Sequence, residues 1–544
     1  MNQKIIASAT IIIGIVATTA IGLAMRTTPP SSAGVKNTTL RSSVSAPIET
    51  LDSDTYGSLG ASDVISATNV GLYARNAKGK VVPAISDGHP QISADHLRYV
   101  FTLRPFKWSN GSPVTAADFV YAWRRLASPA VKARNASRID MIANGYAVRT
   151  GSKPLSALGV KALGRSKLQV TLSTANPYVR ELLARTTMLP INHNFASKLG
   201  NKYGDSSAHT LSDGAFVVQN WTGPKDQRWT YHRNPHFPYQ KQVHLKLINF
   251  RVITDPKQAT QLYRQGKIDY VALDPQQLQN YTGNRNLHYS TSTTAAYLFF
   301  NTTSGATANV HLRRAIATAY DKHLLVKGSL GDGAKALNGL VPAGLATSPQ
   351  GVDYRKDTGQ LLPYNPRYAN AQWQIARQEL HISRIHIPLL IADNDVAQLT
   401  ATFLKGQIEH NLPGITVDIQ KTSLARRITL EEQGKFSVVF STWTPADGDP
   451  YNVLTFNESG NLQNVAGFSD RHYDALLDRI TTKYGPQPVA RWHAIQQAER
   501  LVATQDVPTA GVFQDGTGYL LSSRVKNFPI MPSGNVNYAY ASLY

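Results

Sequence analysis

Two carboxylates and an indole lie close together in the stretch FSTWTPADGDPYNVL, residues 440–454. Asp447 and Asp449 follow Trp443 in this stretch and are enclosed by two prolines. An amine that entered such a site would donate a charge-assisted hydrogen bond to a carboxylate and would contact the face of the indole. Asp-Gly and Asp-Pro are also common turn sequences, in which the aspartate side chain bonds to its own backbone. A cation site and a simple turn are therefore both compatible with these residues.

Short strands and helices must position this turn. The residues before it, FSVVFSTW (436–443), form a β-branched run that predicts a strand, so the carboxylates are expected at the C-terminal end of that strand. Similar patterns predict strands at residues 97–105, 168–173, 243–253, 297–303, 387–393 and 414–422. Apolar residues at helical spacing predict helices at residues 114–129, 255–266, 311–328 and 401–412. This mixture predicts an α/β protein.

Sequence motifs for catalysis are absent from the chain. It contains no zinc-protease helix, Walker loop or G-x-S-x-G elbow. The glycine-rich stretch at residues 328–337 lacks the Gly-Lys-Ser/Thr ending and is interpreted as a loop. His236 and His244 do not have the spacing of one helical face. We therefore predict a protein that is not an enzyme, with no catalytic residues, no metal ligands and no cofactor.

The composition is that of a soluble globular protein with a basic surface. The chain has 544 residues, 42% of them hydrophobic, and a formal net charge of +21. Such a length allows two or three packed domains. The basic residues are spread along the whole chain and form no basic stripe, so no nucleic acid is expected as a partner. There is no cysteine, which excludes disulfides, thiolate chemistry and a Cys-linked lipid anchor.

The N-terminal residues predict export. The stretch from Ile5 to Met25 carries no charge and lies between Lys4 and Arg26. Its length is about that of a helix that crosses a bilayer, and small residues near its end would also permit signal cleavage. Residues 1–25 are therefore predicted to be a signal peptide or a membrane anchor, both of which remain open. Residues 26–48 are rich in Ser, Thr, Pro and Ala and predict a flexible tether.

One long stretch then gives the chain a family resemblance. KWSNGSPVTAADFVYAWRRLASP, Lys107 to Pro129, resembles the signature of the family 5 extracellular solute-binding proteins, the peptide-binding receptors of ABC importers. Other blocks follow in family order, among them LGVKALGRSKLQVTLSTANPY, YRQGKIDY, AAYLFFNTT, LRRAIATAYDKHLL and NLPGITVDIQKT. The resemblance runs from about Ile48 to the C-terminus.

The resemblance implies a two-lobed, periplasmic-binding-protein-like α/β fold of the class II type, with an additional inserted subdomain and a hinge between the lobes. Lobe I is expected to comprise residues 49–72, 208–301 and 518–544. The inserted subdomain is expected at residues 73–207 and lobe II at residues 302–517. A monomer is implied.

The resemblance also implies a set of peptide-binding residues. Residues 443–450 fall on the ligand turn of the family, commonly Trp-x-Ala-Asp-Tyr-x-Asp-Pro, whose first Asp binds the α-ammonium group of the peptide. Ala446 stands where that Asp is expected and Asp447 stands where the Tyr is expected. We expect Asp447 to be re-aimed into the pocket, with Asp449 as the alternative acid. The predicted peptide-binding residues are Trp443, Asp447, Asp449, Asn464, Leu59 and Thr444.

Several departures from the family pattern indicate an altered ligand specificity. A tyrosine-rich family stretch near the ligand appears here as RNASR, Arg134 to Arg138. Leu424, Glu431 and Phe440 lie where better-studied relatives carry an aromatic residue and two arginines.

The resulting hypothesis is an extracytoplasmic receptor that binds oligopeptides between two lobes and delivers them to the permease and ATPase subunits of an ABC importer. It would lie at the outer face of the cell membrane or the cell wall, with the N-terminal segment as its link to the membrane. One alternative is a peptide-signal (pheromone) receptor. A second is a surface protein on the same scaffold that binds anionic cell-wall polymer and no longer transports.

Overall fold

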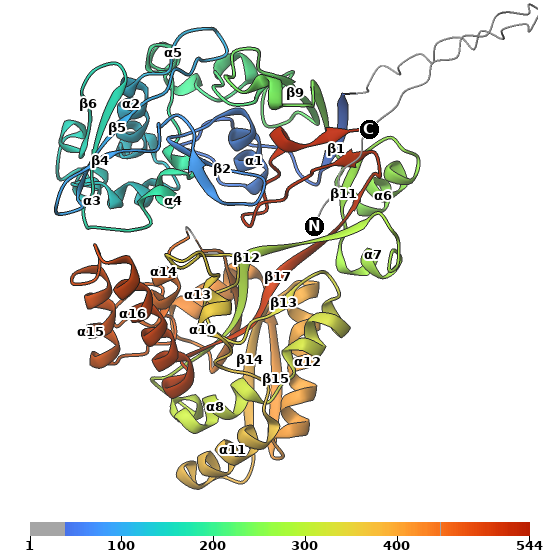
Figure 1. The fold of residues 1–544 in the computed structure, drawn as a ribbon. Coiled ribbons are helices and arrows are strands. Elements are labelled where there is room, and N and C mark those ends of the chain that lie inside the picture. Colours follow the sequence, from blue (N-terminus) through green and yellow to red (C-terminus); the bar gives the residue numbers. More distant parts are fainter. Residues whose placement is uncertain (1–37, 446–447) are drawn as a thin grey trace, which may run out of the picture. The chain divides into compact units, whose positions relative to one another are not determined.

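The computed structural model describes residues 38–445 and 448–544, which belong to one folded unit, Thr38–Tyr544 (Figure 1). The predicted signal or anchor segment, residues 1–25, lies outside the described residues. Within the described ranges, no helix has both the length and the apolar character needed to cross a membrane.

The first sheet begins with a strand where a tether was predicted. Thr39–Val44 form β1, which pairs in parallel with β10 from Thr39↔Leu247 to Val44↔Val252. The Ser/Thr-rich composition suggested a tether, but pairing with β10 gives these residues backbone hydrogen bonds, and Leu40 is fully buried. The prediction of a tether as far as residue 48 is therefore wrong for residues 39–44. The sheet has the order β1-β10-β9-β8, with β8 at Phe216–Gln219, β9 at Arg228–Arg233 and β10 at Leu247–Val252.

The second sheet has seven strands in the order β11-β17-β12-β16-β14-β15, and β13 pairs with β17. In Figure 1, the long strands β12 and β17 run from the part of the sheet that contains β11 to the part that contains β14 and β15. The β12–β17 register shifts between Thr291 and Ala295. The strands are β11 Tyr270–Ala272, β12 Leu287–Phe300, β13 Lys335–Ala336, β14 Ile385–Ala392, β15 Ile415–Thr422, β16 Val438–Trp443 and β17 Thr509–Leu521.

Helices surround the lower part of this sheet in Figure 1. They include α8 Val310–Thr318, α10 Tyr354–Thr358, α11 Pro366–Leu380, α12 Asp395–Asn411, α13 Leu424–Glu432, α14 Tyr451–Leu454, α15 Arg471–Thr481 and α16 Pro488–Leu501. The single helix predicted at residues 311–328 is divided in the structure. α8 ends at Thr318, and the Asp321 carboxylate accepts hydrogen bonds from the backbone N–H groups of His323 and Leu324 (2.8 and 3.1 Å), which starts the short helix α9, Lys322–Leu324.

A third sheet, of order β4-β5-β7-β6, belongs to the segment between β2 and β8. Its helix α2, Ala116–Leu126, begins where the sequence predicts, since the Asp118 carboxylate accepts a hydrogen bond from the backbone N–H of Thr115 at 2.8 Å. The elements of this segment include β2 Tyr73–Arg75, β3 Val81–Pro83, β4 Gln91–Ile92, β5 Arg98–Thr102, α3 Gly145–Arg149, β6 Val160–Ala162, β7 Lys167–Thr171, α4 Val179–Leu183 and α5 His193–Leu199.

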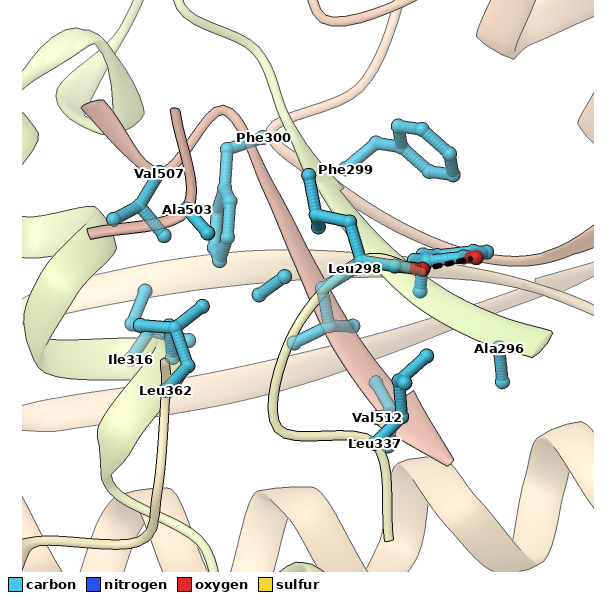
Figure 2. Packing of buried hydrophobic residues seen from close by; sticks show 14 of the residues in the cluster. Ala296, Leu298, Phe299, Phe300, Ile316, Leu337, Leu362, Ala503, Val507 and Val512 are labelled. Carbon is cyan, nitrogen blue, oxygen red and sulfur yellow. Dashed lines mark hydrogen bonds between the residues drawn. The ribbon is translucent and has the colours of Figure 1, made fainter. Parts of the chain in front are cut away.

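The buried apolar residues form separate cores. The largest extends from Ala295 to Phe513, and Figure 2 shows Phe300 of β12 beside Ala503 and Val507. A second core extends from Leu72 to Tyr203. A third core joins residues 40–64, 215–252 and 519–543, and a smaller cluster lies beside it at residues 253–278. We refer below to the third core with its neighbour as lobe I, to the second core as the inserted subdomain, and to the largest core as lobe II.

One buried carboxylate connects distant segments of lobe I. Asp269, before β11, accepts hydrogen bonds from the Arg41 side chain (Nε at 3.1 Å, Nη2 at 2.8 Å) and from the Arg524 side chain (Nε at 2.8 Å, Nη2 at 2.6 Å). Burial alone would raise the pKa of Asp269, but these hydrogen bonds outweigh it and lower that pKa. Arg524 also donates to the carbonyl oxygen of Thr39 at 3.1 Å. Arg524, near the end of the chain, therefore fixes the first strand. It directly precedes β18, Val525–Lys526, which pairs with the last strand, β19, Ser542–Leu543.

Candidate functional site

A cavity of 380 Å³ lies where the three parts of the structure meet. Lobe I contributes residues of α1 (Leu59–Thr68) and of the loop at residues 531–540. The inserted subdomain contributes β2 and the segment that follows α4. Lobe II contributes loop residues, namely Gly344, Leu345, Pro445 and Gly448. A cavity of this size is within the range of sites that bind small molecules and short peptides.

The turn predicted from the sequence reaches this cavity. β16 ends at Trp443, and Pro445 and Gly448 line the cavity on either side of residues 446–447. Asp447 lies outside the described residues, so its part in binding an amine stays a prediction.

Trp443 and Thr444 lie at the end of β16 and are not among the lining residues. The indole of Trp443 meets the ring of Phe456 edge-on, with centroids 4.5 Å apart, and the Thr444 hydroxyl lies 2.7 Å from the Thr294 hydroxyl of β12. Both contacts fix the strand from which the turn departs.

Asp449 forms a buried ion pair. Its carboxylate accepts hydrogen bonds from Arg491 Nη1 at 2.9 Å and Nη2 at 2.7 Å, and Asp449 is 2% exposed. The Arg491 guanidinium lies over the rings of Tyr178 and Tyr451, at 5.4 and 5.8 Å from their centroids. Asp449 does not line the cavity. We therefore interpret it as a residue that fixes the turn, and its predicted direct contact with a peptide stays a prediction.

Leu59 and Asn464 are also not among the lining residues of the cavity. Leu59 is the first residue of α1 and is 57% exposed, and a Cβ atom at Gly534 would lie 3.2 Å from its side chain. The Asn464 amide donates to the carbonyl oxygens of Glu458 and Phe468 at 2.9 and 2.7 Å. Leu59 thus contacts the loop at residues 531–540, and Asn464 holds the loop at residues 458–468.

Phe440, Glu431 and Leu424, the three positions predicted to differ from better-studied relatives, do not contribute to the cavity. Phe440 is 3% exposed and packs near Phe513, while Glu431 accepts a hydrogen bond from Arg427 at 2.8 Å. Leu424 is 58% exposed at the start of α13. They are not lining residues of the cavity.

Charged residues line the cavity, and most of them were not singled out from the sequence. The described lining contains three arginines, Arg75, Arg138 and Arg185, and one acid, Glu181. Arg138 belongs to the RNASR stretch, whose departure from the family pattern was the one available signal. Burial lowers the pKa of Arg75, and burial raises the pKa of Glu181 in spite of the nearby positive charges of Arg75 and Arg180. Glu181 is therefore a carboxylate that lacks a close ionic partner among the described residues.

Glu181 lies next to the predicted turn. It belongs to α4 of the inserted subdomain, and a Cβ atom built on Gly448 would be 3.5 Å from Glu181 Cγ. An acid of the inserted subdomain thus lies next to the turn at residues 443–450 of lobe II. In the part of the chain that the structure describes, no cluster of three His, Asp or Glu residues could hold a metal ion.

Comparisons with known proteins agree with this architecture. The model of the "Bacterial extracellular solute-binding proteins, family 5 Middle" matches residues 80–464. A "Dipeptide-binding protein" of Lactococcus lactis subsp. cremoris is 28% identical over 456 residues, 81% of this chain and 82% of that protein. Among solved structures, "Listeria monocytogenes OppA bound to peptide" has a TM-score of 0.72 at 31% identity, and covers 93% of this chain and 99% of the other. The "pheromone receptor PrgZ" has a TM-score of 0.73 at 27% identity, with 93% and 99% covered. The chain thus has the two-lobed α/β fold of these structures and belongs to the bacterial extracellular solute-binding proteins of family 5.

Proposed function

We propose that this protein is the extracytoplasmic substrate-binding receptor of an ABC importer, and that it binds oligopeptides in the cavity and delivers them to permease and ATPase subunits. The observation that carries the proposal is the cavity of 380 Å³, to which lobe I, the inserted subdomain and lobe II all contribute lining residues. A ligand bound there contacts all three parts at once, so its binding energy favours the closed arrangement of the lobes. The names of the relatives from Lactococcus lactis and Listeria monocytogenes support a peptide as that ligand.

The chemistry of the lining suits a short peptide. Serine and asparagine side chains on and after α1 supply hydrogen-bonding groups that every peptide backbone can use, and Tyr56, Tyr73 and Phe237 supply apolar surface. Such general contacts allow many sequences to bind.

We propose that the amine of the peptide is recognised at the turn at residues 443–450. The sequence proposes Asp447 for this role, and the described structure offers Glu181 beside Gly448. A peptide ammonium there would give the partly buried Glu181 carboxylate a close positive partner.

The finer assignments are also proposals. We propose lobe I at residues 49–72, 208–301 and 518–544, the inserted subdomain at 73–207 and lobe II at 302–517. The separate cores support this division in outline, but Leu40 and Ile48 extend the core of lobe I before residue 49, and Ala295 to Phe300 pack in the core of lobe II. Residues 1–25 act as a signal peptide or an anchor that places the protein at the outer face of the membrane or the cell wall. The protein acts as a monomer.

A peptide-signal receptor is a second candidate, because the PrgZ structure is also similar to this chain. It would use the same cavity and would differ in accepting one peptide instead of many.

Native mass spectrometry of the full-length protein purified from its own cells tests the proposal. After denaturation, the released molecules are sequenced. A ladder of short peptides is expected for an importer receptor, and a single peptide would favour the signal receptor. An empty protein that also stays empty after incubation with a peptide digest would refute both.

A further inference from the structure

The positive charge of the chain is concentrated in the inserted subdomain. Residues 73–207 contain 20 Lys and Arg residues but only 6 Asp and Glu residues, a formal net charge of +14, and the whole chain has +21. Basic residues thus occur along the whole chain, but acids are scarce in this segment. Like charges gathered on one subdomain repel each other, and an anionic partner would relieve this repulsion.

Half of the acids of the subdomain are already engaged within the protein. Asp118 is 1% exposed and lies 2.7 Å from His193 Nδ1, and Asp140 pairs with Arg149 at 2.7 Å. Glu181 lines the cavity. Basic side chains therefore dominate the outer surface of the subdomain.

One face of the sheet β4-β5-β7-β6 is open (Figure 1). The side chains of Tyr99, Phe101, Leu168 and Val170 are buried in the core that the sheet shares with α2. Residues that alternate with these four along β5 and β7, and their partners on neighbouring strands, lie on the other face and are exposed or half-exposed. We call this the open face, and it includes Arg98, Thr102, Lys161, Lys167, Gln169 and Thr171. Basic and uncharged polar side chains thus cover it.

The hairpin between β6 and β7 adds an apolar side chain to the open face. Its residues 161–167, KALGRSK, are all exposed, and Leu163 is 51% exposed. The Leu163 N–H donates to the carbonyl oxygen of Lys167 at 2.9 Å, which places Leu163 opposite Lys167 and on the same face. Among the residues that the structure describes, the side chains of Lys161, Arg165 and Lys167 form no hydrogen bond and no ion pair. Three free cations and an exposed leucine therefore belong to one hairpin.

We propose that the open face and its hairpin form a docking surface for an anionic lipid membrane. Lys161, Arg165 and Lys167 would attract the acidic headgroups, and Leu163 would enter the boundary between the headgroups and the acyl chains. A soluble anionic polymer would use the same charges but would leave the leucine in water, so the exposed leucine favours lipid. The inference goes beyond the proposed function, since it involves neither the cavity nor a peptide.

The test is co-sedimentation with two kinds of lipid vesicle. One kind contains only neutral phosphatidylcholine, and in the other about one lipid in three is the anionic phosphatidylglycerol. The protein comprises residues 38–544, because these residues are one folded unit and lack the apolar stretch from Ile5 to Met25, which would itself bind vesicles. The fraction of protein in the pellet is measured against lipid concentration, at about 0.1 M and about 1 M salt.

Three variants locate the interaction. The hairpin variant replaces its three cations together, as Lys161→Gln, Arg165→Gln and Lys167→Gln. The matched control removes three exposed cations of the same subdomain that lie outside strands β4 to β7, as Lys132→Gln, Lys198→Gln and Lys202→Gln. The third variant is Leu163→Ser. Urea unfolding midpoints equal to that of the native protein show that the variants are folded.

We expect the native protein to bind anionic vesicles at least about tenfold more tightly than neutral ones at low salt, and to lose this preference at high salt. Each basic side chain close to an anionic surface contributes about fivefold, so the hairpin variant should bind about a hundredfold more weakly. The matched control should lose much less. Leu163→Ser should weaken binding by about fivefold, because it removes the apolar contact.

Three results would overturn the inference. The first is equal binding of the native protein to anionic and neutral vesicles, and the second is an equal loss of binding in the hairpin variant and the matched control. The third is unchanged vesicle binding by Leu163→Ser together with equally tight binding of soluble polyphosphate, which would assign the open face to an anionic polymer. None of these results affects peptide binding in the cavity, so the proposed function stands or fails separately.

Discussion

Replacement of Asp449 by Asn should destabilise lobe II strongly, because it removes the charge that balances a buried guanidinium. Asp449 and Arg491 each have 3% of their side chains exposed, and two hydrogen bonds of 2.9 and 2.7 Å join them. Removal of one partner of a buried ion pair costs about 3–5 kcal/mol, since the remaining charge stays buried. The rings of Tyr178 and Tyr451 still stabilise the Arg491 cation, so we expect a value near the lower limit, about 3 kcal/mol.

Urea unfolding followed by tryptophan fluorescence measures this change, since Trp492 follows Arg491 directly in α16. Asp393→Asn is the control, because the Asp393–Lys421 pair has side chains that are 62% and 49% exposed and should contribute less than about 1 kcal/mol. The double variant Asp449→Leu, Arg491→Met removes both charges and should recover most of the loss. If Asp449→Asn costs no more than the Asp393 control, Asp449 does not fix the turn through Arg491 and our interpretation of it is wrong.

Three further predictions concern binding and pH. Glu181→Gln should weaken the binding of peptides with a free amine by about 1.5–3 kcal/mol and leave the binding of N-acetylated peptides unchanged, as measured by calorimetry. The same measurement on Asp447→Ala tests the acid that was predicted from the sequence. Burial raises the pKa of Glu181, so on acidification this carboxylate should lose its charge at a pH above its ordinary pKa of 4.5. The affinity for free-amine peptides, measured by calorimetry at a series of pH values, should therefore fall with a midpoint above pH 4.5. A midpoint below pH 4.5 would contradict this prediction. Lys322 is buried with its ammonium group near the carbonyl oxygens of Leu337 and Leu362 (3.2 and 2.9 Å), and burial lowers its pKa from 10.5 to about 7. Between these two pH values the unfolded chain binds more protons than the folded chain, so the free energy of unfolding should rise with pH. The expected rise is about 2–3 kcal/mol from pH 7 to about 9, measured by urea unfolding. Lys322→Met removes the titrating group, so the variant should lack this part of the rise.

Much of the architecture follows from local patterns in the sequence. The strands β5, β7, β10, β14, β15 and β16 and the helices α2, α6 (Pro256–Arg264) and α12 form where alternation or helical spacing predicts them. These signals are local, because a side chain in a strand or helix faces the core at a fixed period. β1 escaped prediction since its Ser/Thr-rich residues become a strand through pairing with β10, about two hundred residues later in the chain.

The site was less accessible to sequence reasoning. The turn at residues 443–450 reaches the cavity through Pro445 and Gly448, while the peptide-binding roles predicted for its residues stay predictions. Arg75, Glu181 and Thr187 were not singled out from the sequence, because only folding brings β2, α4 and the segment that follows α4 around one cavity. Asp449, in contrast, was predicted to contact the ligand because of its position in the turn, but in the structure it is paired with Arg491 and does not line the cavity.

The contacts of Asp269 set an order for the completion of the fold. Arg524 bonds both to Asp269 and to the carbonyl oxygen of Thr39, so β1 gains its last partners only when residues close to the C-terminus have been synthesised. Until then lobe I lacks Tyr519, Val525 and Tyr538 from its core. A nascent chain therefore reaches almost full length before this lobe can close. That delay suits the export that we propose above, because the polypeptide can cross the membrane before its two ends are joined.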